Sequence, residues 1–199
     1  MFAQIAVGVL LSDGHAEVHG NGVRISLQQE GKNQVYFMFL LKQLYTLGYV
    51  ASPQAKLYGR TTVIRNRTLY SLNTFSFGSL YWLRELFYDS NGVKLIRPGL
   101  ELYLTPISLA HAICGDGTWC SYGLALCTNS FTVADNKLLA KMLSNKFGLL
   151  CSCHETGAKG QHRIYVHAQS ITHLRSLVLP HMPIEMHYKL GVNLEHRPK

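Results

Sequence analysis

Two short apolar segments that each end in Asp-Gly constrain this sequence more than any other feature. The first runs from Ala6 to Gly14 and the second from Leu109 to Gly117. Each reads as the end of a helix, because glycine after the acid is a typical helix terminator. Asp13 and Asp116 would then lie at helix C-termini, where the helix dipole disfavours a carboxylate by about 0.3–1 kcal/mol. We therefore expect a cation near both acids, and two acids brought together are typical of a divalent-metal site.

Landmark residues in the first half of the chain recur in the second half at similar spacings. Asp13 and Asp116 are 103 residues apart. Three further pairs of landmarks recur after 91 to 100 residues: the predicted helix ends Leu47-Gly48 and Phe147-Gly148, the Leu-Arg-x-Leu stretches that start at Leu83 and Leu174, and the lysines Lys94 and Lys189. A period near half the chain length predicts two structural copies. We place them at residues 1–98 and 99–199, with the turn-rich segment 91–105 as the connector.

Hydrophobic periodicity predicts the same order of elements in both halves. After the first Asp-Gly we expect a hairpin of strands 15–19 and 23–29, a helix over 34–47, strands 57–65 and 68–77 that turn at Asn66, and a helix over 79–88. The second half follows with strands within 118–129, a helix over 133–147, two more strands and a final helix. The prediction is an α+β fold in which each half has the order αββαββα.

The composition indicates an intracellular protein with a polyanionic partner. The net charge is +8, both halves are basic, and 47% of the residues are hydrophobic, as in a globular protein. The five cysteines are odd in number and lie in the second half, which argues against a disulfide framework and for a reducing compartment. We expect no signal peptide, no import presequence and no membrane segment. A protein encoded by an organelle's own genome needs no import signal.

With these motifs, the chain resembles the LAGLIDADG homing endonucleases in their single-chain form with two motif copies. Besides the two Asp-Gly segments, similar stretches lie at residues 104–110, 126–131 and 183–190. The copies depart from the family motif at its sixth position, where Leu11 and Cys114 replace an acid, and at its third position, where His111 replaces glycine. The resemblance implies two motif helices packed at the centre. It also implies antiparallel sheets that form a DNA-binding saddle in the major groove.

Small residues fit such a central helix pair, because they let two helix backbones approach closely. In the two motif segments these residues are Gly8, Ser12, Ala110, Ala112 and Gly115.

The resemblance also implies the chemistry. Asp13 and Asp116 match the acids that bind Mg²⁺ together with the scissile phosphates, and Ser12 and Gly115, directly before them, are further candidate ligands. We expect two or more Mg²⁺ ions shared between the acids, with Mn²⁺ or Ca²⁺ able to substitute in binding. Lys94 and Lys189 match the basic residue near each cleaved bond. The expected reaction is a staggered break in both strands of a long, imperfectly palindromic double-stranded DNA, made by a monomer and promoting intron mobility.

Strand alternation nominates the residues that would contact DNA from the saddle. Side chains on the solvent face of a strand recur at every second position, and arginine and glutamine suit contacts to guanine and adenine edges. The candidates are Arg24, Ser26, Gln28, Arg60, Thr62, Arg65, Arg67, Arg163, Tyr165 and His167. A shift of one residue in register would exchange the two faces of each strand.

Two other functions stay open at this point. The same fold could serve an RNA-binding maturase that assists the splicing of its host intron. Cys151, Cys153 and His154, with His162 or His167 across the hairpin, resemble part of a zinc site, although Cys-x-Cys in a strand puts both thiols on one face, which is more simply the core. Zinc would suggest a transcriptional regulator. For an intron-encoded protein we expect the organelle matrix or stroma, with the mitochondrion favoured over the chloroplast.

Overall fold

The computed structural model describes residues 1–54, 56–62, 65–157 and 160–197, and for 56–62 and 65–68 this description covers the backbone. The first half contains α1 (Phe2–Leu11), β1 (His15–His19), β2 (Gly22–Glu30), α2 (Gln34–Thr46), β3 (Lys56–Thr62), β4 (Arg65–Asn73) and α3 (Tyr81–Phe87). The second contains α4 (Pro106–Asp116), β5 (Gly117–Cys120), β6 (Gly123–Leu126), α5 (Val133–Phe147), β7 (Cys151–Glu155), β8 (His162–Val166) and α6 (Ala168–Val178). The predicted order αββαββα is confirmed in both halves.

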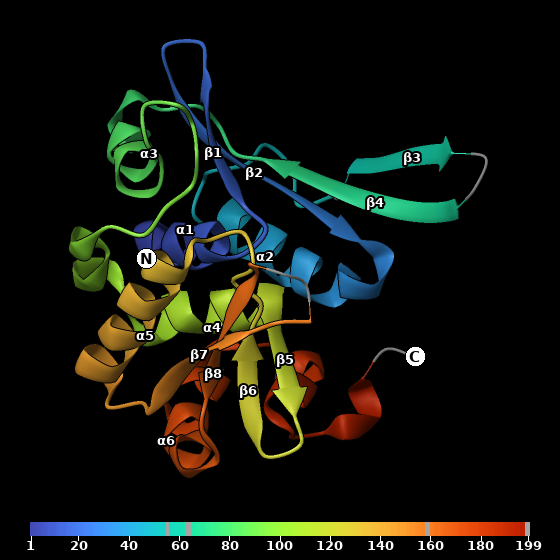
Figure 1. The fold of residues 1–199 in the computed structure, drawn as a ribbon. Helices are drawn as coiled ribbons and strands as arrows, with labels where there is room; N and C mark the ends of the chain where they lie inside the picture. Colours follow the sequence, from blue (N-terminus) through green and yellow to red (C-terminus); the bar gives the residue numbers. More distant parts are fainter. Residues whose placement is uncertain (55, 63–64, 158–159, 198–199) are drawn as a thin grey trace.

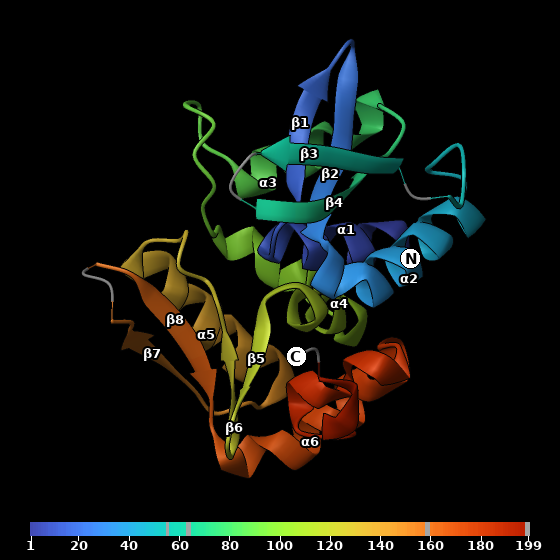
Figure 2. The same cartoon turned by 90° about the vertical axis from the view of Figure 1, so that its right-hand side faces the viewer.

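Two antiparallel sheets flank a central pair of helices. Their strand orders are β1-β2-β4-β3 and β5-β6-β8-β7, which are the same order in successive halves. Figures 1 and 2 show the first sheet above α1 and α4 and the second sheet below them. The arrangement is the predicted α+β saddle. None of the helices in the described ranges is long and apolar enough to cross a bilayer.

Helices α1 and α4 pack closely because glycine lies at two of their contact points. A Cβ added to Gly8 would lie 2.3 Å from the carbonyl oxygen of Ser108 and 2.6 Å from the Cβ of His111. A Cβ added to Gly115 would lie 2.4 Å from the hydroxyl oxygen of Ser12. Histidine at the third position of the second motif is therefore accommodated by glycine at the third position of the first.

The buried histidine is held by its neighbours. His111 is 1% exposed, its Nδ1 lies 3.2 Å from the hydroxyl of Tyr36, and its ring stacks on Phe39. Burial lowers the pKa of His111 to about 4, so the imidazole is neutral at neutral pH. This side chain therefore belongs to the packing between helices.

The glycines that follow the two acids have a different role from the predicted one. Neither Gly14 nor Gly117 has a positive φ, so neither ends its helix in the left-handed conformation. A Cβ on Gly14 would lie 2.7 Å from the carbonyl oxygen of Val9, and one on Gly117 would lie 2.6 Å from that of Ile113. These glycines are required because the chain folds back against the last helical turn.

The turn predicted at Asn66 is wrong. Asn66 lies within β4 and pairs with Thr61 of β3, and the strand ends at Asn73. Residues 63–64 lie outside the described residues. The pairing of β3 with β4, which begins at Lys56 opposite Ser71, sets the position of the turn and outweighs the local turn preference of asparagine.

The predicted alternation is present in β2 and β8. In β2, Val23, Ile25 and Leu27 are buried, whereas the residues between them face outward. In β8, Ile164 and Val166 are buried, whereas Tyr165 between them and Arg163 before them face outward. The apolar faces cover the core, and the polar faces form the concave side of the saddle.

Candidate active site

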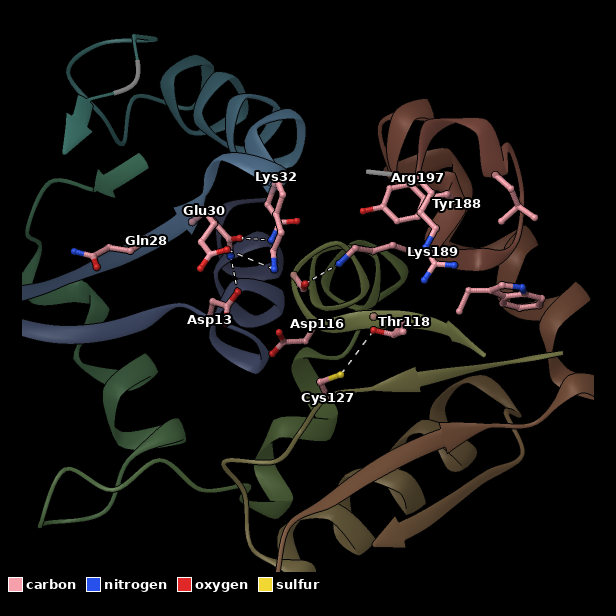
Figure 3. Close-up of a pocket in the computed structure, with 16 residues that line it drawn as sticks. Asp13, Gln28, Glu30, Lys32, Asp116, Thr118, Cys127, Tyr188, Lys189 and Arg197 are labelled. Atoms are coloured by element: carbon pink, nitrogen blue, oxygen red, sulfur yellow. Dashed lines mark hydrogen bonds and ion pairs between the residues drawn. The ribbon is translucent and has the colours of Figure 1, made fainter. Parts of the chain in front are cut away.

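The two acids lie at the ends of the central helices and line one cavity. Asp13 follows α1 by two residues, and Asp116 is the last residue of α4. Figure 3 shows both carboxylates in the space between the two halves, with Lys189 approaching from the second half. The cavity has a volume of about 590 Å³, and its other polar walls come from Gln28, Gln29, Glu30, Lys32, Asn33, Thr118, Cys127, Tyr188 and Arg197.

A lysine binds the carbonyl groups at the end of each motif helix. The ammonium of Lys94 donates to the carbonyl oxygens of Ser12 and Gly14, at 3.0 and 2.9 Å. The ammonium of Lys189, in the 3₁₀ segment Ile184–Leu190, donates to the carbonyl oxygen of Gly115 at 2.7 Å. The negative end of each helix dipole thus receives a cation, and the two lysines take equivalent places in the two halves.

Asp13 is held by an amide relay that the sequence reasoning missed. The Nε2 of Gln29 donates to Oδ2 of Asp13 at 2.5 Å, and the Oε1 of Gln29 accepts from Asn33 at 2.6 Å. Gln29 is 3% exposed and lies on the core face of β2. A polar residue at the core phase of an otherwise apolar strand is the sequence signal that points to it, because buried amides need partners.

Asp116 lies in a different environment from Asp13. It is half-buried, and burial, followed by the nearby charge of Asp13, raises its pKa to about 7, although Lys189 and Lys94 act in the opposite direction. Burial lowers the pKa of Lys94 to about 8 and also lowers that of Lys189, and in both the two acids oppose the shift. The acids repel each other, so a divalent cation between them would be stabilised.

The donors at the helix ends fit a hard divalent cation. Carboxylate oxygens are the ligands that Mg²⁺ prefers, and it keeps several waters or takes substrate phosphates for its other positions. In the part of the chain that the structure describes, no group of three or more His, Cys, Asp or Glu side chains could hold a metal. The two acids would therefore share their ions with solvent and substrate. The carbonyl oxygens of Ser12 and Gly115, the other two candidate ligands, each accept a hydrogen bond from a lysine and keep a second lone pair.

On the first sheet, the predicted DNA contacts lie on the outward face beside Asp13. Arg24, Ser26 and Gln28 line a groove with Asp13 at one end. The Nε of Arg24 donates to Glu17 across the hairpin at 2.8 Å, which fixes the orientation of the guanidinium. In the outer hairpin, Arg60 pairs with Arg67 and Thr62 with Arg65. The side chains of these last four candidates lie outside the described residues.

On the second sheet, two of the predicted contacts, Tyr165 and His167, form a cluster with Ser152 and His154. Arg163 is exposed, and the ring of Tyr165 lies edge-on to both His154 and His167. The hydroxyl of Ser152 lies 2.6 Å from Nε2 of His154 and 2.8 Å from Nε2 of His167. These polar groups lie on the outward face of the second sheet, as Arg24, Ser26 and Gln28 do on the first.

The structure does not assemble the zinc set that the sequence left open. Cys153 pairs with the buried Ile164, whereas its neighbour His154 pairs with the exposed Arg163 on the opposite face. The thiols therefore face the α5 side of the sheet, and His154 faces outward. Within the described residues, these side chains cannot close around one ion.

Comparisons with known proteins agree with this geometry. The chain is 32% identical over 193 residues to the cytochrome b mRNA maturase bI2 of Debaryomyces hansenii, covering 94% of this chain and 72% of that protein. It is 35% identical over 123 residues to the intron-encoded endonuclease ai4 of Dictyostelium discoideum, covering 62% of this chain and 77% of that protein.

Solved structures show the same fold. The homing endonuclease I-WcaI, bound to its DNA recognition sequence, superposes with a TM-score of 0.83 at 26% identity, over 96% of this chain and 86% of that one. I-DmoI in complex with DNA and Mn shares the fold at a TM-score of 0.56 and 12% identity, over 89% of this chain and 95% of that one. The model of the LAGLIDADG DNA endonuclease family matches residues 3–174. With its motif helices, paired sheets and facing acids, the chain belongs to the LAGLIDADG DNA endonuclease family.

Proposed function

We propose that this protein is a site-specific homing endonuclease. It hydrolyses both strands of a long, imperfectly palindromic double-stranded DNA target and leaves a staggered break that promotes intron mobility. The observation that carries this proposal is the pair of acids, one from each motif helix, at the floor of a saddle formed by two matching sheets. The DNA-bound structure of I-WcaI and the name of the Dictyostelium relative support it.

In this proposal Asp13 and Asp116 hold Mg²⁺, or Mn²⁺ or Ca²⁺ in its place, against the scissile phosphates. When bound, the ion polarises the phosphate and lowers the pKa of the attacking water. Gln29 keeps the carboxylate of Asp13 in place through its 2.5 Å hydrogen bond. The remaining candidate ligands, Ser12 and Gly115, contribute through backbone carbonyl groups that also bind the lysines.

Lys94 and Lys189 supply positive charge near the two cleaved bonds. Their ammonium groups are held at the helix ends by carbonyl groups, so their positions are set before substrate binds. Preorganised charge of this kind stabilises the negative charge that develops in the transition state of phosphoryl transfer. One lysine and one acid per half would serve one DNA strand each.

The organisation of the protein follows from the same features. We propose the single-chain form with two motif copies, divided at residues 1–98 and 99–199, acting as a monomer, because both acids and both sheets already lie in one chain. We also propose an origin in a mitochondrial genome and a location in the organelle matrix, as suggested by the cytochrome b maturase relative.

Cleavage of a plasmid tests the proposal. A supercoiled plasmid that carries the rejoined exons flanking the intron is expected to become linear with Mg²⁺ and to stay intact with EDTA. Asp13→Asn and Asp116→Asn keep the shape of the site but remove a charged ligand, so both variants are expected to bind the target without cutting it. Full cleavage by either variant would show that the substituted acid is not required to bind the metal.

A second function, splicing assistance to the host intron RNA, is favoured by a basic groove outside the saddle. It lies between α5 and β7, an edge strand, and is lined by Lys137, Lys141, Ser144 and Asn145, with no acidic side chain among the lining residues. Lysines along an open groove suit a phosphate backbone. Splicing of the purified intron RNA, with wild type and with Lys137→Glu/Lys141→Glu, tests this role. Equal splicing by both proteins would show that the groove has no part in splicing.

A further inference from the structure

The Leu-Arg-x-Leu stretch that repeats between the halves places an arginine on the last helix of each. Arg84 lies in α3 and Arg175 lies in α6, 91 residues apart, and neither lines the cavity of the acids. Both are only partly exposed. Each guanidinium lies over an aromatic ring and donates to a backbone carbonyl. Holding a long arginine side chain in one conformation costs conformational entropy, and both halves hold their arginine in this way.

In the second half, Arg175 contacts the chain directly beside the lysine. Its Nε and Nη2 both donate to the carbonyl oxygen of Leu190, at 2.9 and 2.6 Å, and Leu190 follows Lys189. The guanidinium lies 5.4 Å from the ring centre of Trp119 in β5. Gly191 has a φ of +71°, and a Cβ there would lie 2.4 Å from Trp119, so the backbone of this segment rests against the indole ring.

In the first half, Arg84 acts on the lysine segment through a tyrosine. The guanidinium lies 4.9 Å from the ring centre of Tyr88 and donates to the carbonyl oxygen of Ala16 at 2.8 Å. The hydroxyl of Tyr88 accepts from the backbone N–H of the same Ala16 at 3.1 Å. Tyr88 is in turn the antiparallel bridge partner of Lys94. The arginine and the tyrosine thus fasten the Lys94 segment to β1, the strand that follows Asp13.

We infer that Arg84 and Arg175 are positioning residues for Lys94 and Lys189. Each clamps the lysine segment to the first strand after the acid of its own half, β1 in one half and β5 in the other. The distance between ammonium and acid is thereby fixed by a cross-link that is independent of the lysine side chain. This inference rests on the proposed function, because it concerns the lysines that the cleavage reaction uses.

The physical reason is the sensitivity of the lysine sites to small shifts. Lys189 is 7% exposed, and its ammonium reaches the carbonyl of Gly115 at the end of α4. The segment that carries it is a 3₁₀ helix followed by a left-handed glycine. Misplacement of a reacting group by about 1 Å can cost about 100-fold in rate. A clamp on Leu190 therefore protects the rate without touching substrate.

A double-mutant cycle tests the inference with the full chain, its DNA target and Mg²⁺. Arg175→Met is expected to lower the single-turnover cleavage rate about 10- to 100-fold at saturating DNA, with target affinity unchanged. If the arginine acts only through the lysine, Arg175→Met/Lys189→Met is no slower than Lys189→Met alone. Arg175→Lys, which keeps the charge but loses the planar fork, is expected to fall between wild type and Arg175→Met.

The first half provides an independent cycle with Arg84→Met and Lys94→Met. Lys42→Met, which removes an exposed cation from α2, is the control for the general loss of positive charge and is expected to cleave at the wild-type rate. Thermal unfolding of each variant identifies any that fail to fold. If Arg175→Met is among them, Arg175→Lys is combined with Lys189→Met in the same cycle.

The outcomes separate this inference from the proposed function. If Lys189→Met and Lys94→Met cleave as fast as wild type, the proposed role of the lysines fails. If the lysine variants are slow and adding the arginine substitution slows cleavage further by the same factor as in wild type, the lysines keep their role and the positioning inference is overturned. Loss of DNA affinity without loss of rate in the arginine variants would also overturn it.

Discussion

The side-chain amide of Gln29 donates to the carboxylate of Asp13 at 2.5 Å, whereas no described residue gives Asp116 a comparable hydrogen bond. The two acids therefore meet the metal from different starting states. Asp13 is exposed but held in place, and Asp116 is half-buried, with its pKa raised to about 7 by burial and by the charge of Asp13. The carboxylate of Asp13 is ordered by Gln29, whereas the negative charge of Asp116 depends on the metal.

Replacing Gln29 tests the importance of that hydrogen bond. Gln29→Leu keeps the volume at the core face of β2 but leaves Asp13 without its donor. Outer-shell partners of metal ligands are typically worth about 10- to 100-fold in metal affinity or activity, so the Mg²⁺ concentration for half-maximal cleavage should rise by about that factor. Gln28→Leu, one residue earlier and on the outward face, should weaken DNA binding and leave the Mg²⁺ requirement unchanged. Equal Mg²⁺ requirements in wild type and Gln29→Leu would contradict this role.

The raised pKa of Asp116 makes the stability of the metal-free protein depend on pH. The unfolded carboxyl titrates near 3.8 and the folded one near 7, so the folded state binds more protons in between. The contribution of this carboxyl to stability should therefore fall as the pH rises from about 4 to about 7 and level off above it, opposite in sign to that of His111, whose lowered pKa adds stability as the pH rises from about 4 to 6.5. Asp116→Asn should remove this contribution, so its stability relative to wild type should increase as the pH rises from about 4 to about 7, and its Tm at pH 8 should be higher, as measured by thermal unfolding in EDTA.

Glu85→Gln is the matched control for this experiment, because Glu85 is exposed on α3 and away from both acids. It should retain the wild-type dependence on pH. If Asp116→Asn keeps the same slope, another group causes it, and the carboxyl is not strained in the absence of metal.

Cleavage should also decline at alkaline pH as Lys94 loses its proton. Burial lowers the pKa of Lys94 to about 8, so the ammonium is present below that pH and is lost above it. Lys94→Arg keeps a positive charge at all accessible pH values, because the pKa of arginine exceeds 12. Single-turnover rates between pH 6.5 and 9.5 should show an alkaline limb in wild type that is shifted upward or absent in the variant. A limb at the same pH in both proteins would assign it to a different group.

Substitution of Gly8 probes the contact between the motif helices. Gly8→Ala would place a methyl group 2.3 Å from the carbonyl oxygen of Ser108, and overpacking of this kind typically costs about 1–3 kcal/mol. Urea unfolding should show that loss. Gly157→Ala is the matched control, since a Cβ there meets no atom of the described residues within 4 Å. Comparable stability of the two variants would mean that α1 and α4 can separate without cost.

The sequence was sufficient for features that repeat or that depend on local periodicity. The acids, the lysines and the element order recur between the halves. The alternation of apolar and polar residues in β2 and β8 distinguishes the buried face of each strand from the outward face. Contacts between polar residues far apart in the chain could not be predicted. Gln29 continues the core phase of β2, but its bond to Asp13 depends on how β2 passes the end of α1.

The clamps on the lysine segments escaped prediction for the same reason. Arg84 reaches a carbonyl 68 residues away, and only the tertiary fold brings it there. The turn at Asn66 failed in a different way, because strand pairing set the turn and local preference did not. Local sequence rules therefore located the elements and the repeated residues. The long-range contacts and the position of the turn depend on how the elements pack and pair in three dimensions.

The contact between Gly8 and His111 also determines which halves can be combined. The two motif helices are not interchangeable, because Gly8 of one leaves room for the Cβ of His111 and the carbonyl of Ser108 on the other. A chimaera that joins the first half of this chain to the second half of a relative must preserve that pairing of small and large residues. Two copies of the second half would set histidine against histidine, so the interface itself favours a protein with unlike halves and hence a target with unlike half-sites.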